Sequence, residues 1–388
     1  MKRILIFSLA YYPHVGGAEI ALKEITDRIS DTEFHMVTMR FSALEAREEK
    51  IGAVLVHRIG NGSSKLHKIL FQFFAAYHAS RLHWRYHFNG IWAMMAHSSG
   101  VPAALFKIFH PRVPYLLTLQ EGDPPEYIER LARPVWPLFS RAFTAADAIV
   151  AESTFLGRWA RRRGFTGPLE VVPNGMDAEH FTHNPSPQEL EQIRADIGKK
   201  EGETWLIHTG RLVHKNALDI VIRTLPLLPE SVHFFLLGDG SEKEALIKLG
   251  EKLQVTSRIH FHKYVPLADI PNYLKACDIF IRPSRSEGMG NSFIEAMAAE
   301  LPVIATQEGG IADFLFDAKR NPQKETTGWA VDVDSPEQIA ETVKDILARP
   351  EQVSRVTVTA KKLVVETYNW NLIARTMRTL FDRVFGNS

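Results

Sequence analysis

Residues 282–313 read RPSRSEGMGNSFIEAMAAELPVIATQEGGIAD. This run joins the end of one apolar strand to a Ser/Gly-rich loop, a helix and a second apolar strand at 303–306. A strand–helix–strand order is typical of α/β folds, in which helices cover both faces of a parallel sheet. Two carboxylates mark the middle of the run. Glu287 lies in the loop, and Glu295 lies near the expected start of the helix.

The same alternation extends along the whole chain. Six strands are predicted before Pro173, at 3–9, 34–39, 53–57, 91–96, 115–119 and 148–151. Five more follow it, at 205–209, 232–237, 259–262, 279–282 and 303–306, with helical patterns at 19–29, 218–228, 242–253 and 337–348. The Pro/Gly-punctuated segment 171–181 divides the two series. The sequence therefore predicts two doubly wound, Rossmann-like domains facing a central cleft.

The bulk composition is that of an ordinary globular protein. Of the 388 residues, 45% are hydrophobic and 23% are charged, and the net charge of +1 gives no reason to expect a nucleic-acid partner. The single cysteine, Cys277, excludes an intrachain disulfide and fits a reducing compartment. The short apolar N-terminal run leads into Pro13, so we interpret it as a first buried strand rather than a signal peptide. We expect a cytoplasmic protein without a membrane span.

Glu287 and Glu295 have two interpretations. Ser292 and Glu295 have the spacing of a capping box, and Glu287-Gly288 has the composition of a polar turn. Alternatively, a loop carboxylate beside a helix N-terminus binds a sugar and a phosphate together, because carboxylates accept hydrogen bonds from hydroxyls and helix starts attract anions. That combination predicts a nucleotide-sugar site.

Other turns that follow strands carry suitable groups. Gly16 and Gly17 precede a helix, where they form either a tight turn or a close approach to phosphate. Arg211 and Lys215 follow a strand of the second half, either as surface cations or as diphosphate ligands. Asp332-Val333-Asp334 matches a metal-binding pattern but has the context of a strand-end turn, so no metal site is predicted.

The motifs in order are GG after the first strand, PNGMD at 173–177, GRLVHK at 210–215, GDG at 238–240, and the long run quoted above. This order resembles the retaining glycosyltransferases of family four, group one, which have the GT-B fold. The resemblance covers essentially the whole chain. It implies an acceptor-binding domain at 1–172 completed by a crossover helix within 368–388, and a donor-binding domain at 173–367.

The resemblance also implies roles for particular residues. Arg211 and Lys215 would hold the donor diphosphate, and Glu287 would contact the transferred sugar, so these three are the candidate catalytic residues. Glu295 would bind the ribose, and Gly16 and Gly17 would approach the diphosphate. Backbone N–H groups of the loop would complete the donor site, at Gly288, Met289, Gly290 and Asn291.

One departure from the family pattern affects the first domain. Family members commonly place a histidine after the strand at 115–119, whereas this chain has Gln120-Glu121-Gly122-Asp123. A glutamine hydrogen-bonds a hydroxyl but does not titrate. Gln120, Glu121 and Asp123 are therefore the candidates for binding the acceptor or orienting the sugar.

The implied reaction is retaining transfer of a hexose from a UDP- or GDP-linked sugar to an acceptor hydroxyl, with no cofactor and no metal. The alternatives are a nucleotide-sugar epimerase of the same fold and a non-catalytic nucleotide-sugar-binding subunit. A nicotinamide dehydrogenase is excluded because GxGxxG is missing.

The acceptor is predicted from residues 65–92, which mix basic and aromatic side chains. Such a helix lies at a membrane surface or packs on the core with a cationic outer face. With the basic stretch at 158–163, it favours a lipid-linked or envelope glycan acceptor and peripheral contact with the inner face of the membrane.

Overall fold

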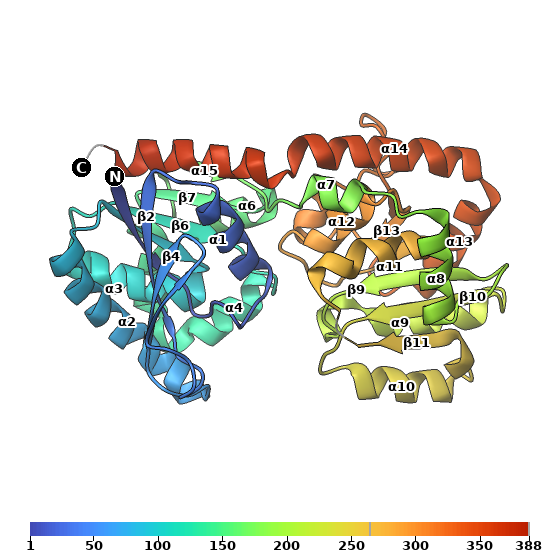
Figure 1. Ribbon diagram of the computed structural model, residues 1–388, viewed down its shortest axis with the longest axis horizontal. Coiled ribbons are helices and arrows are strands. Elements are labelled where there is room, and N and C mark those ends of the chain that lie inside the picture. The colour runs from blue at the N-terminus through green and yellow to red at the C-terminus, as the bar shows by residue number, and fades with distance from the viewer. Residues whose placement is uncertain (264, 387–388) are drawn as a thin grey trace. The chain divides into compact units, whose positions relative to one another are not determined.

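The computed structural model describes residues 1–263 and 265–386 (Figure 1). The chain forms two compact units. Unit 1 comprises Met1–Gly175 and Trp370–Ser388, and unit 2 comprises Met176–Asn369. These bounds lie close to the domain limits expected at 1–172 with 368–388 and at 173–367, although residues 387–388 lie outside the described part of the chain.

Unit 1 is built on an eight-stranded sheet with the order β3-β4-β2-β1-β5-β6-β7-β8. All neighbours are parallel except β3 and β4, which pair antiparallel. The strands are β1 (Lys2–Phe7), β2 (Thr32–Met39), β3 (Glu48–Ile51), β4 (Val54–Ile59), β5 (Gly90–Met94), β6 (Tyr115–Leu119), β7 (Ala148–Ala151) and β8 (Leu169–Val171).

Two strands of unit 1, β3 and β8, are absent from the sequence prediction, and the expectation of a purely parallel sheet is wrong at one edge. The four residues of β3, EEKI, are almost all exposed and carry no apolar pattern. An edge strand of this kind buries little apolar surface, so its position depends on backbone pairing with β4.

The helices of unit 1 cover the sheet. They are α1 (Gly17–Asp27), α2 (Lys65–Tyr86), a π-helical turn η1 (Ala96–Gly100), α3 (Val101–Phe109), α4 (Pro125–Ala132), η2 (Arg133–Val135), α5 (Trp136–Thr144), α6 (Thr154–Arg162) and the C-terminal α15 (Trp370–Phe385). Although α15 is last in the chain, it packs against α1 within unit 1. This agrees with the crossover helix that the resemblance implies.

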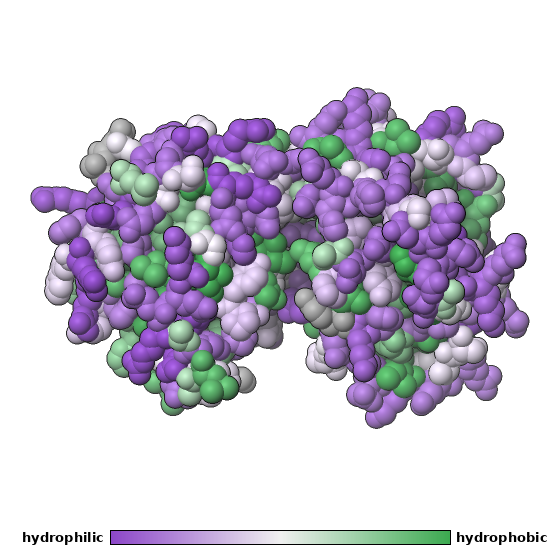
Figure 2. Space-filling model, in the orientation of Figure 1, coloured by the Kyte–Doolittle hydropathy of each residue, from purple (hydrophilic) through white to green (hydrophobic). Residues whose placement is uncertain are grey.

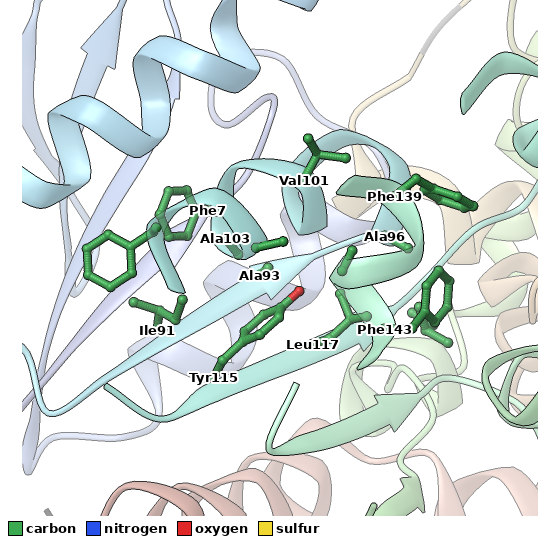
Figure 3. Close-up of a cluster of buried hydrophobic side chains, with 14 of the residues drawn as sticks. Phe7, Ile91, Ala93, Ala96, Val101, Ala103, Tyr115, Leu117, Phe139 and Phe143 are labelled. Carbon is green, nitrogen blue, oxygen red and sulfur yellow. The ribbon is translucent and has the colours of Figure 1, made fainter. Parts of the chain in front are cut away.

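The core of unit 1 lies on both faces of its sheet. On one face, side chains of β5 and β6 pack against α3 and α5, and Figure 3 shows Ile91, Ala93 and Leu117 together with Phe139 and Phe143. On the other face, Trp92 packs with Phe381 of α15 at a ring-centroid distance of 5.0 Å. Successive strand residues point to opposite faces, so a continuous apolar strand supplies both layers.

Unit 2 is built on a six-stranded parallel sheet with the order β11-β10-β9-β12-β13-β14. The strands are β9 (Thr204–Thr209), β10 (Val232–Leu237), β11 (Ile259–His262), β12 (Ile279–Arg282), β13 (Val303–Ala305) and β14 (Trp329–Ala330). The strand order turns back between β9 and β12. In open parallel sheets, ligands bind beyond the carboxyl ends of the strands at such a point.

Helices cover both faces of this second sheet. They are α7 (Ala178–Thr182), α8 (Pro187–Ile197), α9 (Leu218–Thr224), α10 (Lys243–Lys252), α11 (Ile270–Ala276), α12 (Asn291–Ala298), α13 (Pro336–Ala348) and α14 (Pro350–Thr367). The 3₁₀ turns are η3 (His214–Asn216), η4 (Leu225–Leu227), η5 (Thr256–Arg258), η6 (Leu267–Asp269) and η7 (Gly309–Asp313). Cys277 is a buried core residue of this unit.

Across residues 1–263 and 265–386, no helix combines the length and apolar character that crossing a bilayer requires.

Candidate functional site

The carboxylate of Glu287 is the centre of a charged cluster in unit 2. Its Oε2 accepts a hydrogen bond from Nη2 of Arg282 at 3.1 Å. Its Oε1 lies 3.5 Å from Nζ of Lys215 and 3.2 Å from the N–H of Gly288. The residue is only 8% exposed. A buried carboxylate is stable when it is paired and hydrogen-bonded, and two cations and a backbone N–H meet that need here.

The backbone of Glu287 is fixed by the Gly309-Gly310 pair. The carbonyl oxygen of Glu287 accepts a hydrogen bond from the N–H of Gly310 at 3.1 Å. A Cβ on Gly309 would lie 1.8 Å from that oxygen, and Gly309 has a φ of +65°. Only glycine fits such a close approach in the left-handed region, so the two glycines serve to position Glu287.

The loop after Glu287 leads directly into α12. The N-cap is Gly290, with a φ of +91°, and no side chain caps the helix. A Cβ on Gly290 would lie 2.8 Å from Nη2 of Arg282, so this glycine also gives room to the guanidinium group. The helix therefore begins with uncapped backbone at the point where Arg282 and Glu287 meet.

The capping-box interpretation of Ser292 and Glu295 is wrong. The helix begins two residues earlier than a cap at Ser292 requires, at Asn291, so Ser292 is its second residue rather than its cap. The hydroxyl of Ser292 is buried and has no hydrogen-bond partner among the described residues. Glu295 is then the fifth residue of α12, too far along the helix to close its start.

Arg282 is the functional candidate that the sequence analysis missed. It ends β12, is 6% exposed, and lies over the ring of Phe293 with 4.1 Å between the guanidinium carbon and the ring centroid. It pairs with Glu287, and its charge also acts on Glu295. The available signal was a lone arginine at the end of an otherwise apolar strand, IFIR, immediately before the site loop.

Burial raises the pKa of Glu295 to about 7, and the positive charge of Arg282 only partly offsets this effect. A second buried group, His208, lies close to Arg282. The imidazole of His208 in β9 has a pKa that burial lowers to about 3, so the ring is neutral. Both side chains lie beside Gly210, because a Cβ added to Gly210 would be 3.8 Å from Nε2 of His208 and 3.7 Å from Nη1 of Arg282.

Arg211 and Lys215 lie in the loop after β9. Arg211 is exposed, whereas Lys215 is partly buried against Glu287. The GDG turn supports this loop, because the N–H of Leu212 donates to the carbonyl of Asp239 at 2.9 Å. A Cβ on Gly240 would lie 2.2 Å from the carbonyl oxygen of Leu212. The turn is therefore structural, and its glycines allow the arginine loop to lie close.

Ion pairs of Arg285 and Arg320 account for the Asp-Val-Asp pattern. Asp334 bonds to Nε of Arg285 at 2.7 Å, and Asp332 bonds to Nη2 of Arg320 at 2.8 Å. Arg285 also forms two hydrogen bonds to Asp219, at 3.0 and 2.9 Å, and its N–H donates to the carbonyl of Lys215 at 2.7 Å. Arg285 therefore links the loop of Lys215 to the loop of Glu287. Within the described ranges, no cluster of three or more His, Cys, Asp or Glu side chains has the arrangement of a metal site.

The unit 1 candidates lie in the segments that follow β1 and β6. Gly16 is the N-cap of α1, and its N–H donates to the carboxylate of Glu19 at 2.7 Å. Gly17 is the first residue of the helix. Gln120 and Glu121 follow β6 and are buried, at 8% and 2% exposed, whereas Asp123 is exposed. The structure thus gathers Lys215, Glu287, the 288–291 loop and Glu295 around Arg282 in unit 2.

Two family models match the chain. The model for Glycosyltransferase Family 4 matches residues 15–180, and the model for Glycosyl transferases group 1 matches residues 189–380. One similar protein is the GDP-mannose-dependent alpha-(1-6)-phosphatidylinositol monomannoside mannosyltransferase of Mycolicibacterium smegmatis, 27% identical over 61% of this chain and 64% of the relative. Another is the sulfoquinovosyl transferase of Arabidopsis thaliana, 28% identical over 66% of this chain and 49% of the relative. The matches thus span about half to two thirds of these relatives' length.

Solved structures with the same fold match along the whole chain. Sucrose-phosphate synthase from Thermosynechococcus elongatus has a TM-score of 0.84 with 18% identity, covering 100% of both chains. HepE from Anabaena, in complex with UDP-glucose, has a TM-score of 0.79 with 19% identity, covering 99% of this chain and 100% of its own. The chain belongs to the family-four, group-one glycosyltransferases and has the GT-B fold.

Proposed function

We propose that the protein transfers a hexose from a UDP- or GDP-linked sugar to an acceptor hydroxyl, with retention of the anomeric configuration. The observation that carries this proposal is the buried pair of Glu287 and Arg282, with the partly buried Lys215, at the start of α12, where no side chain caps the helix. Two cations beside a helix N-terminus favour a diphosphate, and carboxylates beside them favour sugar hydroxyls.

Each charged residue then has a chemical role. Arg211 and Lys215 bind the diphosphate and stabilise the negative charge that grows as the bond from the anomeric carbon to the phosphate oxygen breaks. Backbone N–H groups of 288–291 add to this stabilisation, and Gly16 and Gly17 approach the diphosphate from their own turn. These groups supply the required charge without a metal ion. Glu287 orients the sugar, and Glu295 accepts hydrogen bonds from the ribose hydroxyls.

Retention follows from attack on the same face as the departing group. The acceptor oxygen bonds to the anomeric carbon, the diphosphate leaves with the bonding electron pair, and the acceptor proton passes to the leaving phosphate oxygen. The step needs no protein nucleophile. Its products are the glycosylated acceptor and a nucleoside diphosphate.

We assign the acceptor to lipid-linked or envelope glycans, with peripheral contact between unit 1 and a membrane. The mycobacterial relative is named for a phosphatidylinositol monomannoside. In this chain, α2 carries an outward stripe at helical spacing, and the exposed fractions of its side chains are 61% for Leu66, 47% for Phe73, 64% for Tyr77 and 70% for Trp84.

The exposed stripe contradicts one of the two interpretations of this helix from the sequence, a helix packed on the core with a cationic outer face. The outer face of α2 is mainly apolar and aromatic, not mainly cationic, while Phe71 and Leu82 pack inward on the core. Figure 2 shows hydrophobic residues gathered at the lower end of unit 1, where Figure 1 draws the first turns of α2. Exposed apolar helix faces that also carry cations, here Arg81 and Arg85, suit an anionic lipid surface.

A donor panel tests the proposed reaction. We expect one UDP- or GDP-linked sugar to raise the melting temperature and to be turned over, and the Arg211→Ala or Glu295→Ala substitution to abolish turnover. Arg223→Ala, which removes an exposed arginine from the last turn of α9, is the control. Near-normal activity of either site variant would contradict the assignment.

A further inference from the structure

Three buried polar side chains form a hydrogen-bonded relay in unit 1. Gln120 follows β6, Glu152 follows β7 and Asn174 follows β8, so all three lie at the carboxyl ends of neighbouring strands. Nδ2 of Asn174 donates to Oε2 of Glu152 at 3.0 Å, and Nε2 of Gln120 donates to Oδ1 of Asn174 at 2.7 Å. The exposed fractions of Gln120, Glu152 and Asn174 are 8%, 6% and 3%.

The chemistry of Glu152 sets the direction of this relay. A carboxylate only accepts hydrogen bonds, so Asn174 must turn its NH₂ group toward Glu152 and its oxygen toward Gln120. Gln120 must then donate its own NH₂ group to that oxygen. The carbonyl oxygen Oε1 of Gln120 takes no part in the relay. It is buried and has no hydrogen-bond partner among the described residues.

The same loop holds a second buried acceptor oxygen without a hydrogen-bond partner among the described residues. Oε1 of Glu121 accepts a hydrogen bond from the N–H of Ala96 at 2.5 Å and lies 3.7 Å from Nδ1 of His97. Its other oxygen, Oε2, is buried and has no partner in the described part of the chain. Unsatisfied buried acceptors cost free energy, so native proteins keep them chiefly where a ligand or water completes the bond.

We infer that Glu152 and Asn174 are positioning residues that hold Gln120 with its carbonyl oxygen toward a sugar hydroxyl of the substrate. This inference rests on the proposed function and deepens it. Gln120 and Glu121 together offer two accept-only oxygens, which fit a ligand that donates hydrogen bonds, as a polyol does. A titratable histidine at position 120 would supply a donor or an acceptor according to pH, whereas the relay fixes an acceptor.

Exchanging the carboxylate and the amide tests the direction of the relay. In Glu152→Gln the carboxylate is lost, so the amides of residues 152, 174 and 120 no longer have a forced direction. We expect the kcat/KM for transfer to fall roughly tenfold, as for loss of one oriented hydrogen bond. In Asn174→Asp two carboxylates face each other, so we expect both the melting temperature and the activity to fall.

The double variant Glu152→Gln/Asn174→Asp places an acceptor at the centre of the relay. The carboxylate introduced at the central position then receives a hydrogen bond from the amide on each side, and Gln120 again turns its oxygen outward. We therefore expect both the melting temperature and kcat/KM to recover relative to Asn174→Asp. Glu126→Gln, an exposed change in α4, is the matched control. A Glu152→Gln variant with unchanged kcat/KM, or a double variant no more active than Asn174→Asp, would overturn the inference.

Deoxy analogues identify the contacted hydroxyl. The wild type should lose activity with one analogue of the donor sugar or of the acceptor, and Gln120→Met should make no distinction between that analogue and the full substrate. If the loss of activity caused by Gln120→Met and the loss caused by a deoxy analogue are additive for every analogue, Gln120 contacts no hydroxyl. If the wild type transfers no sugar at all, the proposed function fails. The melting temperatures of the Glu152 and Asn174 variants still report whether the relay exists.

Discussion

At the scale of single residues, the proposed donor site depends on charged side chains that are largely shielded from water. Arg282 pairs with Glu287 while Glu295 lies nearby on α12, and burial raises the pKa of Glu295 to about 7. Below that pH Glu295 is protonated in the ligand-free protein, and above it Glu295 is ionised. An ionised carboxylate accepts two hydrogen bonds from a ribose diol, and charge-assisted bonds of this kind are the stronger ones.

This predicts that donor affinity rises with pH. The diphosphate of an intact nucleotide sugar is esterified at both ends, so the ligand itself does not titrate in this range. We expect binding at pH 8 to be up to about tenfold tighter than at pH 6, because the ionised fraction changes by about that factor around a pKa of 7. Calorimetric titration at the two pH values measures the effect. Glu295→Gln should bind with equal affinity at both, and a pH dependence retained in that variant would assign it to another group.

At the scale of elements, α2 (Lys65–Tyr86) has two apolar stripes with different neighbours. One packs on the core of unit 1 through Phe71, Ala75, Ala79 and Leu82. The other is exposed, which is an unusual concentration of large apolar side chains for a single surface helix. The loops of unit 2 depend on small residues instead. Gly290 and Gly309 let a guanidinium group and a backbone carbonyl approach closely, where a Cβ would collide with them.

The stripe on α2 predicts binding to lipid vesicles. We expect the wild type to float with liposomes that contain anionic lipid, and Phe74→Ser/Trp84→Ser to reduce the floated fraction without loss of stability, because the two side chains are 59% and 70% exposed. Val358→Ser removes a similarly exposed apolar side chain from α14 of unit 2 and serves as the control. Flotation that is unaffected by the double change, or that does not depend on anionic lipid, would rule out this helix as the contact.

At the scale of the whole molecule, the two ends of the chain complete the same unit. α15 packs into the core of unit 1, where Phe381 lies 6.1 Å from Phe34 between ring centroids and 5.0 Å from Trp92. A Cβ on Gly90 would lie 2.1 Å from the ring of Phe385, so β5 and α15 are in close contact. The apolar residues of α15 form one helical face, which the sequence pattern indicates without identifying its partner.

This packing predicts that a substitution near the C-terminus destabilises unit 1. Phe381 is 1% exposed, and Phe381→Ala should lower the free energy of unfolding by about 3–5 kcal/mol through lost burial and the cavity that remains. Urea denaturation measures the change. Leu372→Ala on the same helix, at a side chain 36% exposed, should cost far less. Equal losses in the two variants would mean that α15 does not contribute to this core.

Much of the architecture follows from local pattern. Seven of the eleven strands predicted from apolar runs have the observed bounds or differ by one residue at one end, namely 115–119, 148–151, 205–209, 232–237, 259–262, 279–282 and 303–306. Buried parallel strands are continuous apolar segments between turn residues, so their positions depend on nearby residues alone. The strands β3, β8 and β14 were missed because they are short and are held by pairing rather than by burial of an apolar run.

The amino-acid sequence is enough to predict the two-unit α/β architecture, the candidate residues Arg211, Lys215, Glu287 and Glu295, and the family. Each of these depends on residue type and spacing along the chain. Three further features are visible only in the folded chain: Arg282 pairs with Glu287, Ser292 lies inside α12, and Gln120 belongs to a relay with Asn174 and Glu152. Those contacts join residues from different strand ends, and burial sets their protonation and direction, so no local pattern contains them.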